Sequence, residues 1–207
     1  MNTANPARTL IEALIAFYGR RDYPGDVAAA SMLDAVHAEL AGVEAFKPLP
    51  EPRAIAASVL LQSALPRTPL GATISQAMPL FRWRQNPNYT VANMGAAFMA
   101  GYGYVEFAGP KEALFYASGI RVGLLLLGPG LHYPLHAHPA EEVYHPLTAD
   151  GLWRRGDEAW RTVPAGHAIH HPPMMPHESK ATDRTLIALY CWRGDTRTEA
   201  RLATRQE

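Results

Sequence analysis

The chain has 207 residues, 48% of them hydrophobic, and its 19 basic residues balance its 19 acidic residues. This is enough apolar material for one or two compact units, and a formally neutral chain gives no electrostatic case for binding nucleic acid or an anionic membrane. A single cysteine, Cys191, excludes an intrachain disulfide and favours a reducing, cytoplasmic location, while no stretch approaches the ~20 apolar residues of a membrane span.

Helices are expected over the first 80 or so residues. Asn5 followed by Pro6 is a typical helix start, and apolar residues then recur at helical spacing as far as Tyr18. Asp26 is expected to cap a second helix whose apolar residues share one face. A third helix is predicted over residues 53–64, because a proline follows soon after.

Short strands are expected in the rest of the chain. From about Tyr89 onward glycines become frequent, and runs rich in Val, Leu, Phe and Tyr alternate with turns. Many short, evenly spaced strands predict an all-β sandwich or barrel, so residues 1–85 are expected to form a helical extension packed on a barrel of residues 86–207. The expected strands cover residues 121–127, 134–138, 142–147, 152–154, 159–163, 167–171, 177–181 and 184–192.

The most informative segment runs from His136 to Tyr144. Its side chains that can bind a metal, or work beside one, stand at even positions: His136, His138, Glu142 and Tyr144. Since successive side chains of a strand point to opposite faces, an even-only set on one strand shares a face. Burying such a set is costly unless something pairs with it. A divalent metal is the simplest partner, because neutral imidazole and carboxylate are its usual protein ligands.

Two segments together resemble the cupin family. Gly130, His136, His138 and Glu142 have the spacing of the first cupin motif, and a Pro-Pro turn followed by His177 has the form of the second. The resemblance implies a mainly β fold, the cupin double-stranded β-helix (jelly-roll) barrel, with an N-terminal α-helical extension. It also implies one divalent transition metal per chain (Zn²⁺, Fe²⁺ or Mn²⁺), with His136, His138, Glu142 and His177 as ligands.

Five further histidines, all between residues 132 and 171, receive no role from the sequence. His167, His170 and His171 stand before the Pro-Pro turn and do not fit the ligand position, so they are expected to face solvent or a backbone carbonyl. His145 is out of phase with the even-numbered set and is expected on the opposite face. His132 cannot be oriented by alternation, because a proline follows it closely.

The string from Tyr133 to Tyr144 resembles the metal-binding string of the cupin-type dimethylsulfoniopropionate (DMSP) lyases. The resemblance implies a carbon–sulfur lyase that cleaves DMSP, a small sulfonium carboxylate, to dimethyl sulfide and acrylate by β-elimination while the metal binds the substrate carboxylate. Tyr144 falls on the catalytic tyrosine, and a phenol beside a divalent cation ionises readily enough to act as general base. Tyr133 falls on a second active-site tyrosine that also contacts substrate, and Trp192 on an aromatic pocket position.

Two other classes of function stay open at this point. Another metal-dependent cupin enzyme, such as an Fe(II) dioxygenase, an isomerase or a lyase acting on a different small carboxylate, would use the same ligands, and a need for oxygen would separate the first of these. A non-catalytic small-molecule-binding cupin is the second class, although residues 53–64 lack the basic surface of a DNA-recognition helix. The sequence does not fix the oligomeric state, and a homodimer is compatible with it.

Overall fold

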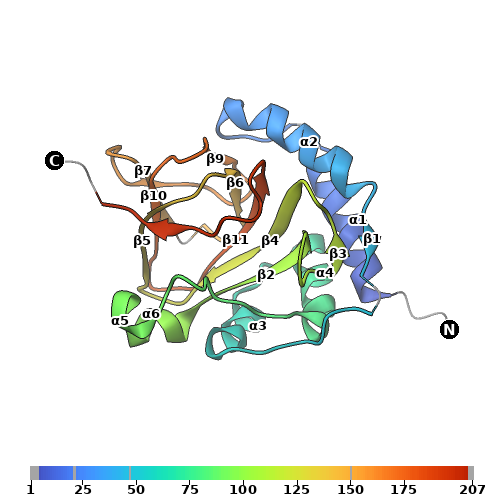
Figure 1. The fold of residues 1–207 in the computed structure, drawn as a ribbon, viewed down its shortest axis with the longest axis horizontal. Helices are drawn as coiled ribbons and strands as arrows, with labels where there is room; N and C mark the ends of the chain where they lie inside the picture. Colours follow the sequence, from blue (N-terminus) through green and yellow to red (C-terminus); the bar gives the residue numbers. More distant parts are fainter. Residues whose placement is uncertain (1–4, 21, 47, 150, 205–207) are drawn as a thin grey trace.

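Two β-sheets face each other and form a barrel, with helices packed on the outside of one of them (Figure 1). The computed structural model describes residues 5–20, 22–46, 48–149 and 151–204. Among these, seven strands form a sheet in the order β1-β3-β2-β4-β11-β6-β9, and five form a second sheet in the order β12-β5-β10-β7-β8. The predicted mainly β cupin barrel with N-terminal helices is confirmed.

The eight expected strands are all present, each with ends within two residues of the prediction. Strands β1, β2, β3 and β12 were not predicted, and β2 is the longest of them. The larger sheet contains β1 (Glu44–Ala45), β2 (Tyr102–Gly109), β3 (Phe115–Tyr116), β4 (Ile120–Leu127), β6 (Glu141–Pro146), β9 (Ile169–His171) and β11 (Leu186–Arg193). The smaller sheet contains β5 (His132–Ala137), β7 (Gly151–Arg155), β8 (Arg161–Thr162), β10 (His177–Ala181) and β12 (Arg201–Leu202).

The first helix begins as predicted, with the Asn5 side chain accepting a hydrogen bond from the backbone N–H of Ala7. The predicted helix over residues 53–64 is wrong in its first part. Arg53 instead pairs through its backbone with Phe81 and Trp83, and only a 3₁₀ turn and the short α3 follow. The helices are α1 (Pro6–Tyr18), α2 (Ala30–Leu40), α3 (Leu61–Ala64), α4 (Pro69–Ala77), α5 (Val91–Met94) and α6 (Ala96–Gly101). None of the described helices combines the length and the apolar character that crossing a membrane requires.

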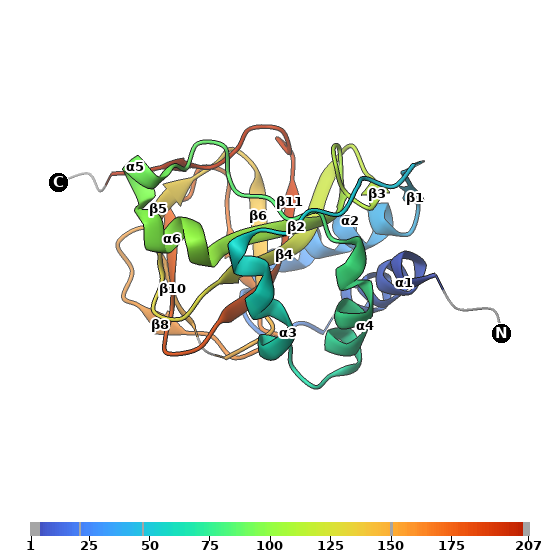
Figure 2. The same cartoon turned by 90° about the horizontal axis from the view of Figure 1, so that it is seen from below.

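The larger sheet is buried on both faces, so its central strands are continuous apolar runs instead of alternating ones. On β11, Ile187, Leu189 and Cys191 face the helices, where α2 and α3 contact the strand. Tyr190 and Trp192 face the barrel interior. Figure 2 shows α1, α3 and α4 along the outer side of β2 and β4. One set of strands therefore serves both an aliphatic core outside the barrel and an aromatic core inside it.

Asp26 ties the N-terminal part of the chain to the barrel and does not cap a helix as predicted. Its side chain makes no cap hydrogen bond. Instead its Oδ2 accepts hydrogen bonds from Arg155 at 3.0 Å, from Arg161 at 3.2 Å and from the backbone N–H of His170 at 2.9 Å. Burial alone raises the pKa of Asp26, but these hydrogen bonds and charges outweigh it and hold the pKa below its usual value.

Candidate metal centre

The metal-binding string spans two strands, as the predicted strand ranges 134–138 and 142–147 indicate, so its even-numbered side chains do not share one face of a single strand. His136 stands near the end of β5 in the smaller sheet, and Glu142 stands on β6 in the larger sheet. His138 lies in the turn between them. The side chains converge because the chain crosses from one sheet to the other and both strands point them into the space between the sheets.

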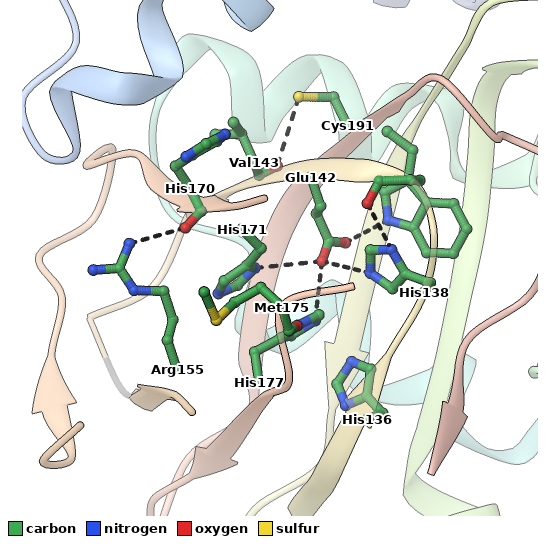
Figure 3. Close-up of polar contacts among 12 residues, drawn as sticks. His136, His138, Glu142, Val143, Arg155, His170, His171, Met175, His177 and Cys191 are labelled. Carbon is green, nitrogen blue, oxygen red and sulfur yellow. Dashed lines mark hydrogen bonds and ion pairs between the residues drawn. The ribbon is translucent and has the colours of Figure 1, made fainter. Parts of the chain in front are cut away.

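Three of the predicted ligands form a compact group (Figure 3). Glu142 Oε2 lies 3.1 Å from Nε2 of His138 and 3.1 Å from Nε2 of His177. One potential ligand atom from each of the three residues lies within 4.8 Å of the others, and all three residues are buried. The spacing is therefore suited to one small cation held between the two imidazoles and the carboxylate.

The hydrogen bonds of the histidines favour a cation at this point. Nδ1 lies 3.0 Å from the Ala140 carbonyl oxygen in His138 and 2.8 Å from the Met175 carbonyl oxygen in His177. A carbonyl oxygen only accepts, so each Nδ1 carries a proton, and in a neutral ring Nε2 is then a lone pair. Two lone pairs facing the Glu142 carboxylate are unfavourable unless positive charge lies between them, and either a proton on one of the rings or a bound cation supplies that charge. The donor set therefore fits a divalent transition metal, which binds neutral imidazole and carboxylate together.

His136 lies beside this group without being a member of it. Its ring stands 4.1 Å from that of His177 between centroids and stacks on Tyr133 at 3.9 Å. Its Nδ1 donates to the Pro134 carbonyl oxygen at 2.8 Å, so its Nε2 is a lone pair as in the other two rings. Burial and the neighbouring His177 lower the pKa of His136 well below its usual value, which keeps the imidazole neutral and able to bind a metal.

Glu142 is the centre of the arrangement. Burial alone raises its pKa, but the imidazoles of His138, His171 and His177 outweigh burial and hold the pKa well below its usual value. Its second oxygen, Oε1, accepts a hydrogen bond from the indole N–H of Trp192 at 2.6 Å. The carboxylate is thus ionised and held from both sides. Trp192, expected as an aromatic pocket residue, also orients a predicted ligand.

The predicted environment, solvent or a backbone carbonyl, is wrong for His170 and His171, which both face glutamates. His171 is buried, and its Nδ1 lies 3.5 Å from Glu142 Oε2. His170, one residue earlier, points the other way and places Nε2 2.9 Å from Glu141 Oε1. His171 lies near the metal-binding group because it stands in β9 directly opposite Glu142 in β6. This strand pairing cannot be inferred without the sheet topology.

The remaining histidines stand away from the cluster. His132 on β5 is half-exposed and places Nε2 2.8 Å from Glu178, on the outside of the smaller sheet. His145 is fully buried on the helix side of β6, as alternation predicted. Among the described residues neither of its ring nitrogens has a hydrogen-bond partner. His167 lies in the turn before β9 and is partly buried.

A cavity lined in part by Glu142 opens inside the barrel. Tyr144, Tyr133 and Trp192, the predicted catalytic and substrate-binding residues, all lie on its wall. The Tyr133 hydroxyl is 3.2 Å from that of Tyr89. A small molecule in this cavity is therefore surrounded by aromatic side chains: Tyr102, Tyr104, Tyr133, Tyr144, Tyr190 and Trp192.

Tyr144 stands two residues after Glu142 on β6 and packs against the rings of Trp153 and His171. Burial and the neighbouring Glu142 carboxylate raise the pKa of Tyr144 well above its usual value. The protein by itself therefore keeps this phenol protonated. Positive charge added at the His138–Glu142–His177 group would lower that pKa.

The wall of the cavity on the β4 side carries compensated charges. The buried Arg121 forms ion pairs with Glu106 and, at 3.1 Å, with Glu199 from the segment after β11. The next residue, Ala200, also lines the cavity and accepts a hydrogen bond from the Asn86 side chain at 2.9 Å. The C-terminal segment therefore closes one side of the cavity, and the guanidinium there is already paired.

A family model and a curated relative both match this chain. Residues 53–188, more than half of the chain, match the family model described as dimethylsulfoniopropionate lyase. A curated relative, dimethylsulfoniopropionate lyase DddQ of Ruegeria pomeroyi, is 32% identical over 120 residues. That alignment covers 56% of this chain and 57% of the relative, so the chain matches little more than half of the relative's length.

Two similarities to solved structures extend over nearly the whole chain. The DMSP lyase DddQ of Ruegeria pomeroyi superimposes with a TM-score of 0.80 at 24% identity, covering 99% of this chain and all of that one. A structure described with the DMSP lyases RdDddP and RnDddQII gives 0.81 at 23% identity, covering 96% of this chain and 98% of that one. At these identities the similarity shows the fold, including the helices that the family model does not cover.

Proposed function

The chain belongs to the dimethylsulfoniopropionate lyase family, and from that premise we propose that it cleaves DMSP to dimethyl sulfide and acrylate in the cavity beside Glu142. The observation that supports this most is the direct adjacency of the His138–Glu142–His177 group, Tyr144 and an aromatic-walled cavity. DMSP has a carboxylate at one end and a dimethylsulfonium cation at the other. The cavity provides a suitable environment for each end.

We assign His136, His138, Glu142 and His177 as the residues that hold one divalent metal of the Zn²⁺, Fe²⁺ or Mn²⁺ class. The three Nε2 lone pairs and the ionised Glu142 carboxylate support this set. When bound, the ion supplies Lewis acidity toward the substrate carboxylate and positive charge that favours the ionised form of nearby acids. The protein contributes the fixed direction of each ring, because each Nδ1–H is tied to a backbone carbonyl.

Tyr144 is the proposed general base. Its phenolate removes the proton from Cα of DMSP, the electron pair forms the Cα–Cβ double bond, and the Cβ–S bond breaks with its electrons going to sulfur. The products are neutral dimethyl sulfide and acrylate, and the proton on Tyr144 then passes to solvent. A positioned base of this kind contributes about 10²–10⁴-fold to the rate.

The aromatic wall recognises the sulfonium end in this proposal. A permanent cation without N–H groups is stabilised by ring faces, each contributing about 0.5–2 kcal/mol. Tyr133 is one of these rings, and its position is fixed because it stacks on His136 and its hydroxyl lies against that of Tyr89. Trp192 also lines the cavity and donates its N–H to Glu142.

The test is anaerobic headspace analysis of metal-loaded protein with DMSP. The wild type is expected to release dimethyl sulfide with equimolar acrylate, and Tyr144→Phe is expected to keep its metal and lose about 10²–10⁴-fold in kcat. Tyr116→Phe is the matched control, since Tyr116 is a half-exposed tyrosine outside the cavity.

Two outcomes would contradict parts of this proposal. Tyr144→Phe with near wild-type kcat would place the base elsewhere. A wild type that releases no dimethyl sulfide with Zn²⁺, Fe²⁺ or Mn²⁺ would remove DMSP as substrate, and turnover of another small carboxylate only in the presence of oxygen would favour the dioxygenase alternative.

A further inference from the structure

His171 is a buried histidine at the end of β9 that is not among the predicted ligands. Its backbone is directly opposite that of Glu142 in the β6–β9 pair. The imidazole stacks in parallel on that of His177, with centroids 4.0 Å apart and an interplanar angle of 10°. Figure 3 shows the ring beside the Glu142 carboxylate, with Nδ1 3.5 Å from Oε2. The residue therefore touches two of the three members of the metal-ligand group.

The distribution of protons separates His171 from its neighbours. His138 and His177 use Nδ1–H on backbone carbonyls, so their Nε2 atoms offer lone pairs to Glu142 Oε2. Nδ1 of His171 is buried with no hydrogen-bond partner among the described residues, and the carboxylate atom it faces, 3.5 Å away, is that same oxygen. A neutral imidazole has one proton, and a carboxylate beside Nδ1 selects the tautomer that has it there. His171 is thus the ring in this cluster that can donate to Glu142.

We propose that His171 is a positioning residue for the metal centre: its Nδ1–H donates to Glu142 Oε2, and its ring fixes the plane of His177. With Trp192 N–H on Oε1, the carboxylate then has a donor on each oxygen and cannot rotate. Partners of this kind typically change metal affinity by about 10- to 100-fold. This inference rests on the metal site of the proposed function and adds a residue that the ligand motifs do not contain.

The test compares three variants by Co²⁺ binding, measured by competition with a chelator and by the visible absorption bands of the bound ion. His171→Leu removes the donor while filling the space, and it is expected to weaken binding about 10- to 100-fold and shift the bands. His171→Asn puts an amide N–H near the place of Nδ1, so affinity is expected to recover to within about threefold of the wild type. His170→Asn changes the neighbour that points to Glu141, and it is expected to leave affinity and bands unchanged.

The possible outcomes distinguish the role of His171 from the proposed reaction. Wild-type affinity and bands in His171→Leu would overturn the proposal, and so would an equal loss in folded His171→Asn, since that would indicate packing instead of a hydrogen bond. If His171→Leu does not fold, His171→Ala takes its place with the same expectation. A wild type that binds Co²⁺ and responds to these variants but does not cleave DMSP would support the role of His171 and contradict the proposed reaction. A wild type that binds no Co²⁺ would contradict both.

Discussion

Histidines are buried beside both faces of β6, but the two environments offer them different partners. Glu142 and Tyr144 point into the barrel, where imidazoles meet a carboxylate and backbone carbonyls. His145 points outward beneath the helices, among the rings of Phe17, Tyr18 and Tyr23 at 5.0–5.8 Å. Both environments exclude water, but only the inner one supplies partners for ring nitrogens. Burial of a histidine therefore does not by itself indicate a site, whereas a fixed tautomer facing a carboxylate does.

The largest expected effect comes from removing an inner histidine. His177→Ala is expected to abolish metal binding and to lower kcat/KM by at least about 1,000-fold, equivalent to about 4 kcal/mol of transition-state stabilisation. The outer variant His145→Phe is expected to keep wild-type metal binding and kcat/KM, because His145 packs against rings outside the barrel. Elemental analysis measures the metal content of the two variants, and dimethyl sulfide release measures their activity. Full metal occupancy in His177→Ala would show that it is not a ligand.

A second pair of variants compares the two sides of β4. Leu124 is fully buried beneath the helices, while the neighbouring Leu125 lines the cavity. Leu124→Ala is expected to lower the free energy of unfolding by about 2–5 kcal/mol with KM unchanged. Leu125→Ala is expected to destabilise less, since space already exists beside it, and to raise KM for DMSP. Urea unfolding and steady-state kinetics test this, and the reverse pattern would mean that the two faces are assigned the wrong way round.

The smallest effect is a pH dependence of stability from the outer histidine. Burial, with a smaller contribution from Arg20, lowers the pKa of His145 to about 3, against 6.5 in an unfolded chain. The unfolded state therefore binds a proton that the folded state does not, and stability present above pH 6.5 is lost as pH falls toward 3, by up to about 1.4 kcal/mol per pH unit.

This dependence can be separated from that of other groups. Urea unfolding of chelator-treated wild type and His145→Phe between pH 7 and pH 4.5 isolates the histidine, because His171, whose pKa is also lowered to about 3, titrates in both proteins. A difference between the two free energies that does not change with pH would show that His145 is protonated or solvated in the folded state.

Several features of the fold could be read from local pattern. Asn5-Pro6 predicts the start of α1 because a side-chain oxygen and a missing N–H suit a helix end regardless of what surrounds them. The eight predicted strands follow from β-branched and aromatic runs between turns. Strand β2 was not predicted, because its glycines interrupt the apolar run as they do in a turn. The segment at Arg53 became extended because it pairs with Trp83, which lies thirty residues further along the chain.

The candidate site was predictable as a set of residue types but not as an arrangement. The motif contains the neutral and anionic ligands that a divalent metal prefers, and this chemistry is a property of the residues alone. The convergence of His138, Glu142 and His177 depends on a crossing between two sheets, and the identification of His171 depends on the β6–β9 pairing. The closing of the cavity by Glu199 and Ala200 depends on contacts with Arg121 and Asn86, far away in the sequence.

Local patterns in the amino-acid sequence were enough to predict the fold class and a set of side chains suited to a divalent metal, because periodicity, turn residues and side-chain donors act locally. Three properties follow from the tertiary structure alone: the face that each side chain occupies, the backbone carbonyl that each Nδ1 meets, and the contact of His171 with Glu142. Those properties depend on backbone carbonyls and neighbouring strands that folding brings within a few ångströms, and no local pattern in the sequence specifies them.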